Sequence, residues 1–233
     1  METVLITGAS RGIGKALTEE FLSQGWRVFA AMRNPKKAEF LLPSKETSSF
    51  LELIQLDVTS DDSVAAAAES VRKATGQLHI LVNNAAVKPE EGEERLADMK
   101  LEWFQQAFET NVVAVARMIQ QFRSLLVSGS CIANISSLLA SISSKNDFGY
   151  YAYGVSKAAL NMLTRTVAAE FAPDGIAVAA ISPGWVRTEM GGTNAPLSPK
   201  ESAQNLFRMI TNLKMDQSGL FMGREGSSSE YPW

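Results

Sequence analysis

The sequence predicts an α/β fold: a doubly wound parallel sheet of about seven strands, covered by helices on both faces. Two observations point to it. Short apolar, β-branched runs alternate with longer segments of helical periodicity, a pattern typical of βαβ units. No segment repeats and no long Pro/Ser/Gly linker divides the 233 residues, so we expect a single domain over residues 1–233. Because βαβ crossovers are almost always right-handed, the doubly wound sheet is the leading topology.

The predicted elements follow in order. A buried strand at residues 4–7 precedes a helix at 12–24, which carries Leu17 and Phe21 on one face and ends at Gly25. Further strands are expected at residues 27–31, 53–58, 78–83, 131–136, 176–181 and, as a short seventh, 219–223. Helical patterns cover residues 61–75, 102–126, 152–171 and, more weakly, 200–213. Two segments look irregular, 35–50 and 184–199. The second follows the carboxyl end of a strand, where open parallel sheets bind ligands, so we expect a substrate loop there.

Composition excludes several classes of protein. With 45% hydrophobic residues, 16 Gly and 8 Pro, the chain is neither disordered nor collagen-like. The single cysteine, Cys131, leaves no disulfide scaffold. The 22 basic and 25 acidic residues form no basic stripe, so we expect no nucleic-acid partner. No apolar stretch approaches the roughly 18 residues that cross a bilayer, and the first residues carry no secretory signal. We therefore expect a cytoplasmic protein with no membrane partner.

A glycine-rich turn lies where the first strand meets the first helix. Gly8, Gly12 and Gly14 stand in it with Ser10, Arg11 and Ile13 between them. Glycines there allow a tight turn and a close approach of a pyrophosphate, and the helix N-terminus favours the phosphates. The spacing therefore indicates a dinucleotide site; the alternative is a tight turn without a ligand.

A second pattern, Tyr153 and Lys157, lies at the start of the helix predicted over 152–171. Residues four apart share a helical face, so the Lys157 ammonium is expected near the Tyr153 phenol. A nearby cation favours the ionised phenol and is expected to lower its pKa toward acid/base chemistry. Tyr150 and Tyr151 have Gly154 and Val155 at the same spacing and lack such a partner. The alternative is a solvated surface pair.

Together these motifs resemble the short-chain dehydrogenase/reductase family, in its compact single-domain form. Seven short motifs occur in the family's order along nearly the whole chain: Gly8-x-x-x-Gly12-x-Gly14, Asp57-Val58, Asn83-Asn84-Ala85, Asn111, Ser136-Ser137, Tyr153-x-x-x-Lys157 and Pro183-Gly184. Within the family, segments 151–162, 183–188 and 194–197 and the final Pro232-Trp233 look most like the C-factor and sniffer-type carbonyl reductases. The resemblance implies a Rossmann-type sheet and an oxidoreductase.

The resemblance also implies catalytic roles. Tyr153 would protonate the developing alkoxide when a carbonyl is reduced, and Lys157 would lower its pKa and hold the nicotinamide ribose. Ser137 would hydrogen-bond the substrate oxygen, where a donor aimed at developing charge contributes several kcal/mol, of order 3. Asn111, in the long helix, would hold a water that feeds protons to Lys157. Each residue alone has an ordinary alternative: Ser137 as a strand-end cap, Asn111 as a helix-surface amide and Tyr153 as a half-buried aromatic.

Residues of the coenzyme site follow from the same resemblance and from charge. The second strand is followed by Arg33-Asn34 with no carboxylate nearby, and Arg11 adds a second cation. A guanidinium accommodates a 2′-phosphate, so we expect NADPH/NADP+ rather than NAD(H); the alternative is that both arginines are solvated. By the family pattern, the remaining coenzyme contacts would be Gly8, Ser10, Gly12, Ile13, Gly14, Asp57, Val58, Asn83, Ala85, Tyr153, Lys157, Pro183, Gly184, Val186 and Thr188.

Two departures from the family pattern stand out. Ala86 occupies the position where the family usually has glycine after Asn-Asn-Ala, which adds a methyl beside the adenosine ribose. Ser137 precedes Tyr153 by sixteen positions, about three more than in many members. Ser136 is further still, so Ser137 is the better candidate. The extra residues are expected to enlarge the loop at 138–152, near the substrate.

The substrate is the least determined part. Seven apolar and aromatic side chains fall on loops near the expected site: Leu138, Leu139, Phe148, Tyr150, Tyr151, Trp185 and Met190. A pocket lined by them favours a hydrophobic ketone, aldehyde or quinone as substrate. The alternative is that these side chains pack the loops against the body of the protein. We expect the partner to be a small-molecule substrate, either a carbonyl compound or an alcohol, because cellular coenzyme ratios and not the sequence set the direction of the reaction. The alternative function is an NADP(H)-binding sensor with little turnover.

Small residues on the helices at 102–126 and 152–171 suit a homodimer or homotetramer, or close packing on the sheet. His79 has no ligand partners at metal spacing, so no metal is expected.

Overall fold

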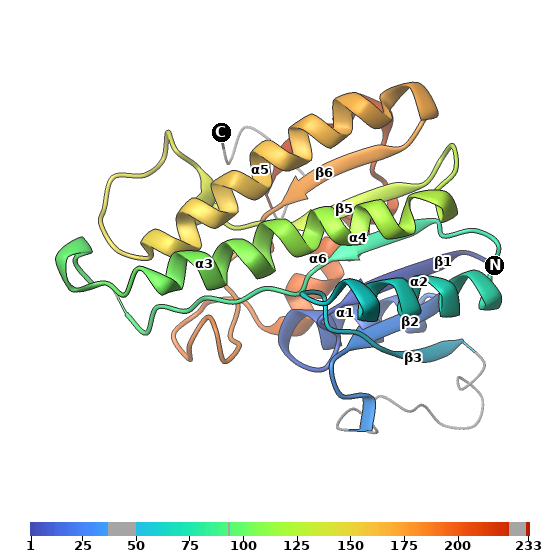
Figure 1. The fold of residues 1–233 in the computed structure, drawn as a ribbon, viewed down its shortest axis with the longest axis horizontal. Helices are drawn as coiled ribbons and strands as arrows, with labels where there is room; N and C mark the ends of the chain where they lie inside the picture. Colours follow the sequence, from blue (N-terminus) through green and yellow to red (C-terminus); the bar gives the residue numbers. More distant parts are fainter. Residues whose placement is uncertain (37–49, 93, 224–231) are drawn as a thin grey trace.

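A computed structural model describes residues 1–36, 50–92, 94–223 and 232–233. Its sheet has seven parallel strands in the order β3-β2-β1-β4-β5-β6-β7, the doubly wound arrangement that the sequence predicts (Figure 1). The strands are β1 Thr3–Thr7, β2 Arg27–Met32, β3 Leu51–Gln55, β4 Ile80–Asn83, β5 Cys131–Ile135, β6 Ala177–Ile181 and β7 Phe221–Met222. Most of the segment expected to be irregular at 35–50 lies outside the described residues.

Helices cover both faces of this sheet. They are α1 Gly12–Ser23, α2 Asp61–Ala74, α3 Glu102–Phe108, α4 Ala114–Phe122, α5 Tyr151–Phe171 and α6 Pro199–Thr211. On one face Phe21 of α1 and Leu206 of α6 belong to a core with the strands, and the Phe21 and Phe207 rings meet edge-on at 4.8 Å. On the other face α2, α4 and α5 pack over a second core that includes Val71, Phe122 and Leu160 (Figure 1). Alternate strand side chains are buried on opposite faces, as both-face coverage requires.

The helix expected over 102–126 is interrupted. A π-helical segment, Glu109–Val113, separates α3 from α4, and a 3-10 turn, Arg123–Leu125, follows α4. π-segments occur mostly as single-turn insertions in α-helices, frequently at functional sites. This one contains Asn111, which is fully buried.

The third strand is shorter than expected and ends at Gln55 rather than residue 58. The Asp57 carboxylate accepts hydrogen bonds from the Thr59 N–H at 3.0 Å and the Thr59 hydroxyl at 2.7 Å. This local turn competes with strand pairing. It leads into α2, whose N-cap Ser60 accepts from the Ser63 N–H.

The segment after β6 lacks helix or strand but is held in place. Val186 and Leu197 form a parallel bridge, and the Arg187 guanidinium donates to the carbonyl oxygens of Ala195 and Pro196 at 2.8 and 2.6 Å. Ser198 then starts α6 with a reciprocal capping box involving Glu201. In the described parts of the chain, no helix is long and apolar enough to cross a membrane.

Candidate active site

The glycine turn after β1 has the backbone that its sequence predicts. Gly8 and Gly12 adopt φ angles of +69° and +55°, in the left-handed region that favours glycine. A Cβ on Gly14 would overlap the Gly8 carbonyl oxygen and lie 2.5 Å from Asn84 Nδ2. Asn84 Nδ2 in turn donates to the Thr7 carbonyl at 2.8 Å. The turn is therefore folded tightly between β1, α1 and the end of β4.

The N-terminus of α1 is suited to an anion. Its N-cap, Arg11, makes no side-chain capping bond, and the first turn contains no acidic residue. Free N–H groups and the positive helix end together form a phosphate site. These N–H donors fit the pyrophosphate of a dinucleotide, because the glycines of the turn place no side chain where the phosphates would approach the backbone.

Arg11 has a partner that the sequence did not reveal. Its guanidinium pairs with the Glu189 carboxylate from the segment after β6, and both side chains are largely exposed. The Thr188 methyl also lies near Gly12, since a Cβ there would come within 3.3 Å of it. These contacts hold the expected substrate loop against the glycine turn.

Residues at the expected adenosine end lie beyond β2 and β3. Arg33 is exposed directly after β2. The Asp57 pKa is lowered by its hydrogen bonds from Thr59 and, to a smaller extent, by the Arg33 and Arg117 charges. The Val58 carbonyl accepts from Arg117 at 3.0 Å. Arg33 thus offers an exposed cation near Asp57, while the Asp57 carboxylate already has a partner in Thr59.

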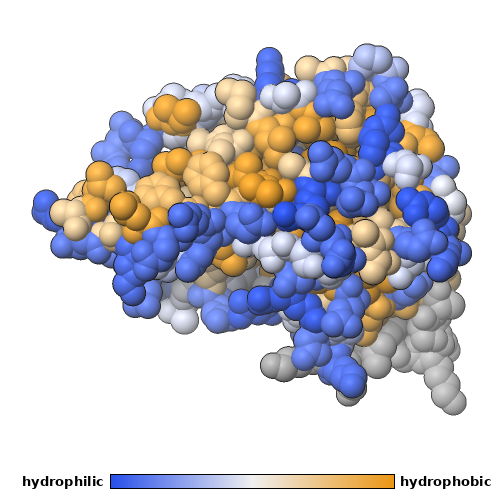
Figure 2. Space-filling view, in the orientation of Figure 1, coloured by the Kyte–Doolittle hydropathy of each residue, from blue (hydrophilic) through white to orange (hydrophobic). Residues whose placement is uncertain are grey.

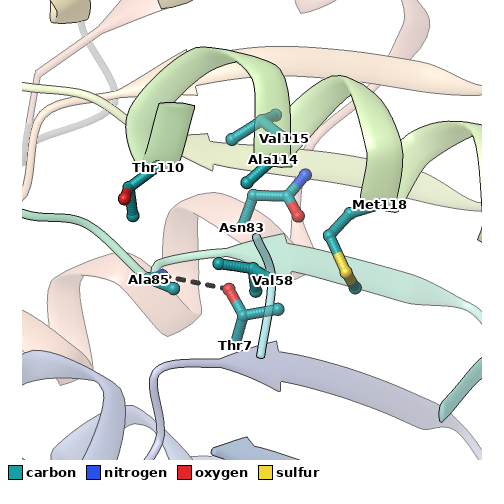
Figure 3. Close-up of a pocket in the computed structure, with 8 residues that line it drawn as sticks. All are labelled: Thr7, Val58, Asn83, Ala85, Thr110, Ala114, Val115 and Met118. Atoms are coloured by element: carbon teal, nitrogen blue, oxygen red, sulfur yellow. Dashed lines mark hydrogen bonds between the residues drawn. The ribbon is translucent and has the colours of Figure 1, made fainter. Parts of the chain in front are cut away.

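A narrow recess lies between β4, α4 and Val58 (Figure 3). The Ala85 N–H donates to the Thr7 hydroxyl at its edge, at 3.0 Å. Asn83 Nδ2 donates to Asn134 Oδ1 at 2.8 Å, so this part of the amide ties β4 to β5. The Asn83 Oδ1 atom is buried and without a hydrogen-bond partner among the described residues. Asn83 and Ala85 both line the recess; Asn83 is almost fully buried there, and Ala85 lies on the side toward Thr7.

The structure brings Ser137, Tyr153 and Lys157 together at the carboxyl end of β5. The Ser137 side chain acts on the Tyr153 phenol and opposes the rise of its pKa, and the Lys157 Nζ atom lies 5.8 Å from the centroid of the Tyr153 ring. Lys157 Nζ also donates to the Ile135 carbonyl at 2.7 Å. Ser136 instead donates to Asn161 Oδ1 at 2.7 Å and is buried. Ser137, and not Ser136, therefore faces the phenol.

Burial governs the charges of this group. It raises the pKa of Tyr153 to about 12, with the Ser137 hydrogen bond opposing this rise and the Glu90 charge adding to it. Burial also lowers the pKa of Lys157 to about 7. The spacing alone predicted a lowered Tyr153 pKa, so the direction in the structure is opposite to that prediction. The reason is that removal from water disfavours the charged form of both groups.

Asn111 organises the neighbouring backbone. Its amide exchanges two hydrogen bonds with the backbone of Val87, each 2.9 Å, and donates to the Ser156 hydroxyl at 2.9 Å. Ser156 in turn donates to the Tyr153 carbonyl at 2.7 Å. The side chain therefore links the loop after β4 to the first turns of α5. Ser156 carried no signal in the sequence pattern beyond its place inside the Tyr153–Lys157 motif.

The residues expected to contact the nicotinamide lie in the segment after β6. Gly184 has a φ of +79°, and the Pro183 carbonyl accepts from Ser202 of α6 at 2.9 Å. Val186 is buried and Thr188 accepts from the Gly191 N–H at 3.1 Å. The segment thus lies between β6, α6 and the glycine turn.

Several of the apolar side chains expected near the substrate are exposed. Leu138 and Phe148 belong to the loop before α5, and Trp185 and Met190 to the segment after β6; each is at least 39% exposed. Leu139, Tyr150 and Tyr151 are half-buried. The space-filling view shows apolar surface extending over this end of the molecule (Figure 2).

Comparison with known proteins agrees with this geometry. A family described as enoyl-(acyl carrier protein) reductase matches residues 8–222. The chain belongs to the short-chain dehydrogenase/reductase family. It is 34% identical to the C-signal of Myxococcus xanthus over 68% of this chain and 95% of that protein.

Solved structures share the whole fold. The carbonyl reductase Sniffer of D. melanogaster has a TM-score of 0.92 at 28% identity, covering 97% of this chain and 98% of that one. An NADPH-bound carbonyl reductase from chicken fatty liver has a TM-score of 0.89 at 32% identity, with the same coverage. The resemblance to C-factor and sniffer-type proteins that the sequence predicts is confirmed, and so is the single-sheet Rossmann-type fold.

Proposed function

We propose that this protein is an NADPH-dependent carbonyl reductase that acts on a hydrophobic ketone, aldehyde or quinone. The observation that carries the proposal is the cluster of Ser137, Tyr153 and Lys157 at the carboxyl end of β5. The glycine turn stands at the same edge of the sheet. In a parallel α/β sheet this edge is where ligands bind.

Each residue has a separate task in the proposed reaction. NADPH, when bound, supplies the hydride. The Ser137 hydroxyl holds the carbonyl oxygen, and Tyr153 donates its phenolic proton to that oxygen as negative charge develops. A phenol whose pKa is raised to about 12 is protonated at neutral pH and so is ready to act as the donor. Lys157, anchored on the Ile135 carbonyl, stays beside the phenol and stabilises its anion after proton transfer.

Preference for NADPH rests on charge at the end of β2. Arg33 is exposed there, and a guanidinium binds a phosphate as a planar fork. Arg33 and Asn34, the residues directly after β2, include no carboxylate to bind ribose hydroxyls. Gly8, Ser10, Gly12, Ile13 and Gly14 would hold the pyrophosphate, and Asp57, Val58, Asn83 and Ala85 the adenosine. Pro183, Gly184, Val186 and Thr188 would contact the nicotinamide.

The test is NADPH oxidation against aromatic aldehydes, quinones, hydrophobic ketones and one enoyl thioester. Tyr153→Phe should abolish turnover and retain NADPH binding, because it removes only the donated proton. Tyr151→Phe is the matched control and should stay active, since Tyr151 has no lysine one turn later. Full activity in Tyr153→Phe would overturn the mechanism, and turnover of the enoyl thioester alone would replace C=O by C=C as the reduced bond.

The similarity to C-signal favours one alternative, an NADP(H)-binding sensor with little turnover. The same panel separates the two functions. Tight NADPH binding with no turnover of any compound would favour the sensor. Turnover that is lost in Tyr153→Phe would favour the reductase, because a sensor needs no proton donor.

A homodimer or homotetramer through α5 is also proposed. Val155 and Met162 of α5 and Val113 of the adjoining π-segment are exposed by 44–68%, and Figure 2 shows apolar surface over these helices. Burying such a patch between two copies removes it from water. Met162→Glu should shift the protein toward monomer in sedimentation velocity; a wild-type monomer would refute this arrangement.

A further inference from the structure

Glu90 is a buried carboxylate that no sequence motif marked. It lies in the loop after β4, and only 2% of its surface is exposed. Within the described residues, no lysine, arginine or histidine forms an ion pair with it. Its Oε1 atom accepts a hydrogen bond from the Tyr153 backbone N–H at 2.9 Å. Its Oε2 atom is buried and has no partner among the described residues. A buried, unpaired carboxylate is costly, so this one calls for an explanation.

The hydrogen bond places Glu90 at the N-terminus of α5. The helix N-cap, Tyr150, has a left-handed φ of +51° and makes no side-chain capping bond. Tyr153 is the third residue of the helix, and its N–H is one of those that an N-cap side chain normally satisfies. Glu90 supplies that acceptor from 63 positions earlier in the chain. The positive end of the 21-residue helix stabilises its negative charge.

Charged groups near Tyr153 come from few elements. Lys157 of α5 lies beneath the ring and donates to Ile135. Among the other elements packed on α5, the described β6 and the turn at Leu138–Ala140 contain no charged residue. Glu102 of α3 is exposed, and Glu109 of the π-segment pairs with Arg117. In the loop after β4, Lys88 lies over the Tyr150 ring, with its Nζ atom 4.9 Å from the ring centroid. Glu90 of the same loop is the buried carboxylate whose charge acts on the Tyr153 phenol, and a hydrogen bond joins it to the Tyr153 backbone.

We propose that Glu90 is a positioning residue for Tyr153: it anchors the first turn of α5 and, through its charge, keeps the Tyr153 hydroxyl in the protonated form. The direction of the effect is electrostatic, because a nearby negative charge disfavours a second one. The Glu90 charge accordingly raises the pKa of Tyr153, in addition to the larger effect of burial. The consequence for catalysis, a phenol biased toward proton donation and so toward carbonyl reduction, rests on the proposed function.

The test compares two isosteric substitutions. Glu90→Gln keeps an oxygen acceptor for the Tyr153 N–H and removes the charge. The ratio of ionised to neutral Tyr153 is measured by carbon NMR of ring-labelled tyrosine, assigned with Tyr153→Phe, at one alkaline pH at which circular dichroism shows both proteins folded. The ratio should rise by about twofold or more, because the Glu90 charge adds to the effect of burial on the Tyr153 pKa as the smaller contribution. Glu91→Gln, which removes the same charge from the exposed neighbouring residue, should leave it unchanged.

A second pair of variants tests the proposal if Glu90→Gln fails to fold. Glu90→Asp and Glu90→Asn share a shorter side chain and differ in charge, and the Asn variant should show the higher ionised ratio. The proposal would be overturned if Glu90→Gln had the same ionised ratio as the wild type and Glu90→Asn the same ratio as Glu90→Asp. A rise in Glu91→Gln equal to that in Glu90→Gln would also overturn it. This titration requires no turnover, so it stands even if the reductase assay fails. In an active enzyme, Glu90→Gln should also move the pH profile of alcohol oxidation to lower pH, a shift that a purely structural defect would not produce.

Discussion

Gly14 offers a sharp test of how the glycine turn is built. Gly14→Ala adds one methyl group at the start of α1. That methyl would overlap the Gly8 carbonyl oxygen and lie 2.5 Å from Asn84 Nδ2. Neither neighbour moves freely, because Gly8 is held in a left-handed turn and Asn84 is bonded to the Thr7 carbonyl. The turn must therefore shift to admit the side chain.

The expected cost follows from two opposing effects. Alanine is the better helix former by about 1 kcal/mol. Overpacking costs about 1–3 kcal/mol, and overlap with backbone belongs at the upper end of this range. The variant should therefore lose about 1–2 kcal/mol of unfolding free energy. A shifted turn also misplaces the N–H groups that face the pyrophosphate, and losing one hydrogen bond to a charged group, about 1.5–3 kcal/mol, weakens NADPH binding at least about tenfold.

Urea unfolding and calorimetric titration with NADPH measure the two effects. Gly76→Ala is the matched control, because a Cβ there meets no atom within 4 Å and Gly76 is not in the left-handed region. It should stay within about 1 kcal/mol of the wild type and bind NADPH normally. A Gly14→Ala protein with wild-type stability and affinity would refute the packing argument.

Three further predictions concern the coenzyme end and the buried lysine. Arg33→Ala should weaken NADPH binding about tenfold or more and leave NADH nearly unchanged by calorimetry, because only NADPH carries the 2′-phosphate. Glu189→Gln should tighten NADPH binding at low salt, since it frees Arg11 and removes a negative charge near the phosphates. Lys157→Met should flatten the pH dependence of stability in chemical unfolding. Burial lowers the pKa of Lys157 from 10.5 to about 7. The unfolded chain therefore holds more protons between these values, and wild-type stability rises with pH there, by up to about 1.4 kcal/mol per unit.

Each of these has a clear contrary result. An unchanged NADPH-to-NADH affinity ratio in Arg33→Ala would show that this cation does not select the coenzyme. Weaker NADPH binding in Glu189→Gln would mean that the ion pair with Arg11 supports the bound state. A Lys157→Met protein whose stability still climbs through the same pH window would assign the proton release to another group.

Local patterns were sufficient for much of the fold and for several site residues. The glycine turn, the alternation of strands and helices, and the Tyr153–Lys157 spacing are short-range features, so their elements could be predicted within a few residues. The interruption around Asn111 could not, because a π-segment keeps the apolar periodicity of the surrounding helix and is set by bonds to Val87 and Ser156. The early end of β3 depends on the Asp57–Thr59 turn, whose competition with strand pairing is not visible in composition.

The sequence by itself determined the type of fold, the turn that admits a phosphate and the residues able to donate a proton, because backbone freedom and side-chain chemistry are properties of single residues and their spacing. Tertiary structure decided which hydroxyl faces the phenol, that Glu90 lies against the first turn of α5, and that Arg11 pairs with Glu189. It also reversed the expected direction of the Tyr153 pKa. These outcomes depend on burial and on contacts between distant segments, which arise only once the sheet has brought its loops to one edge.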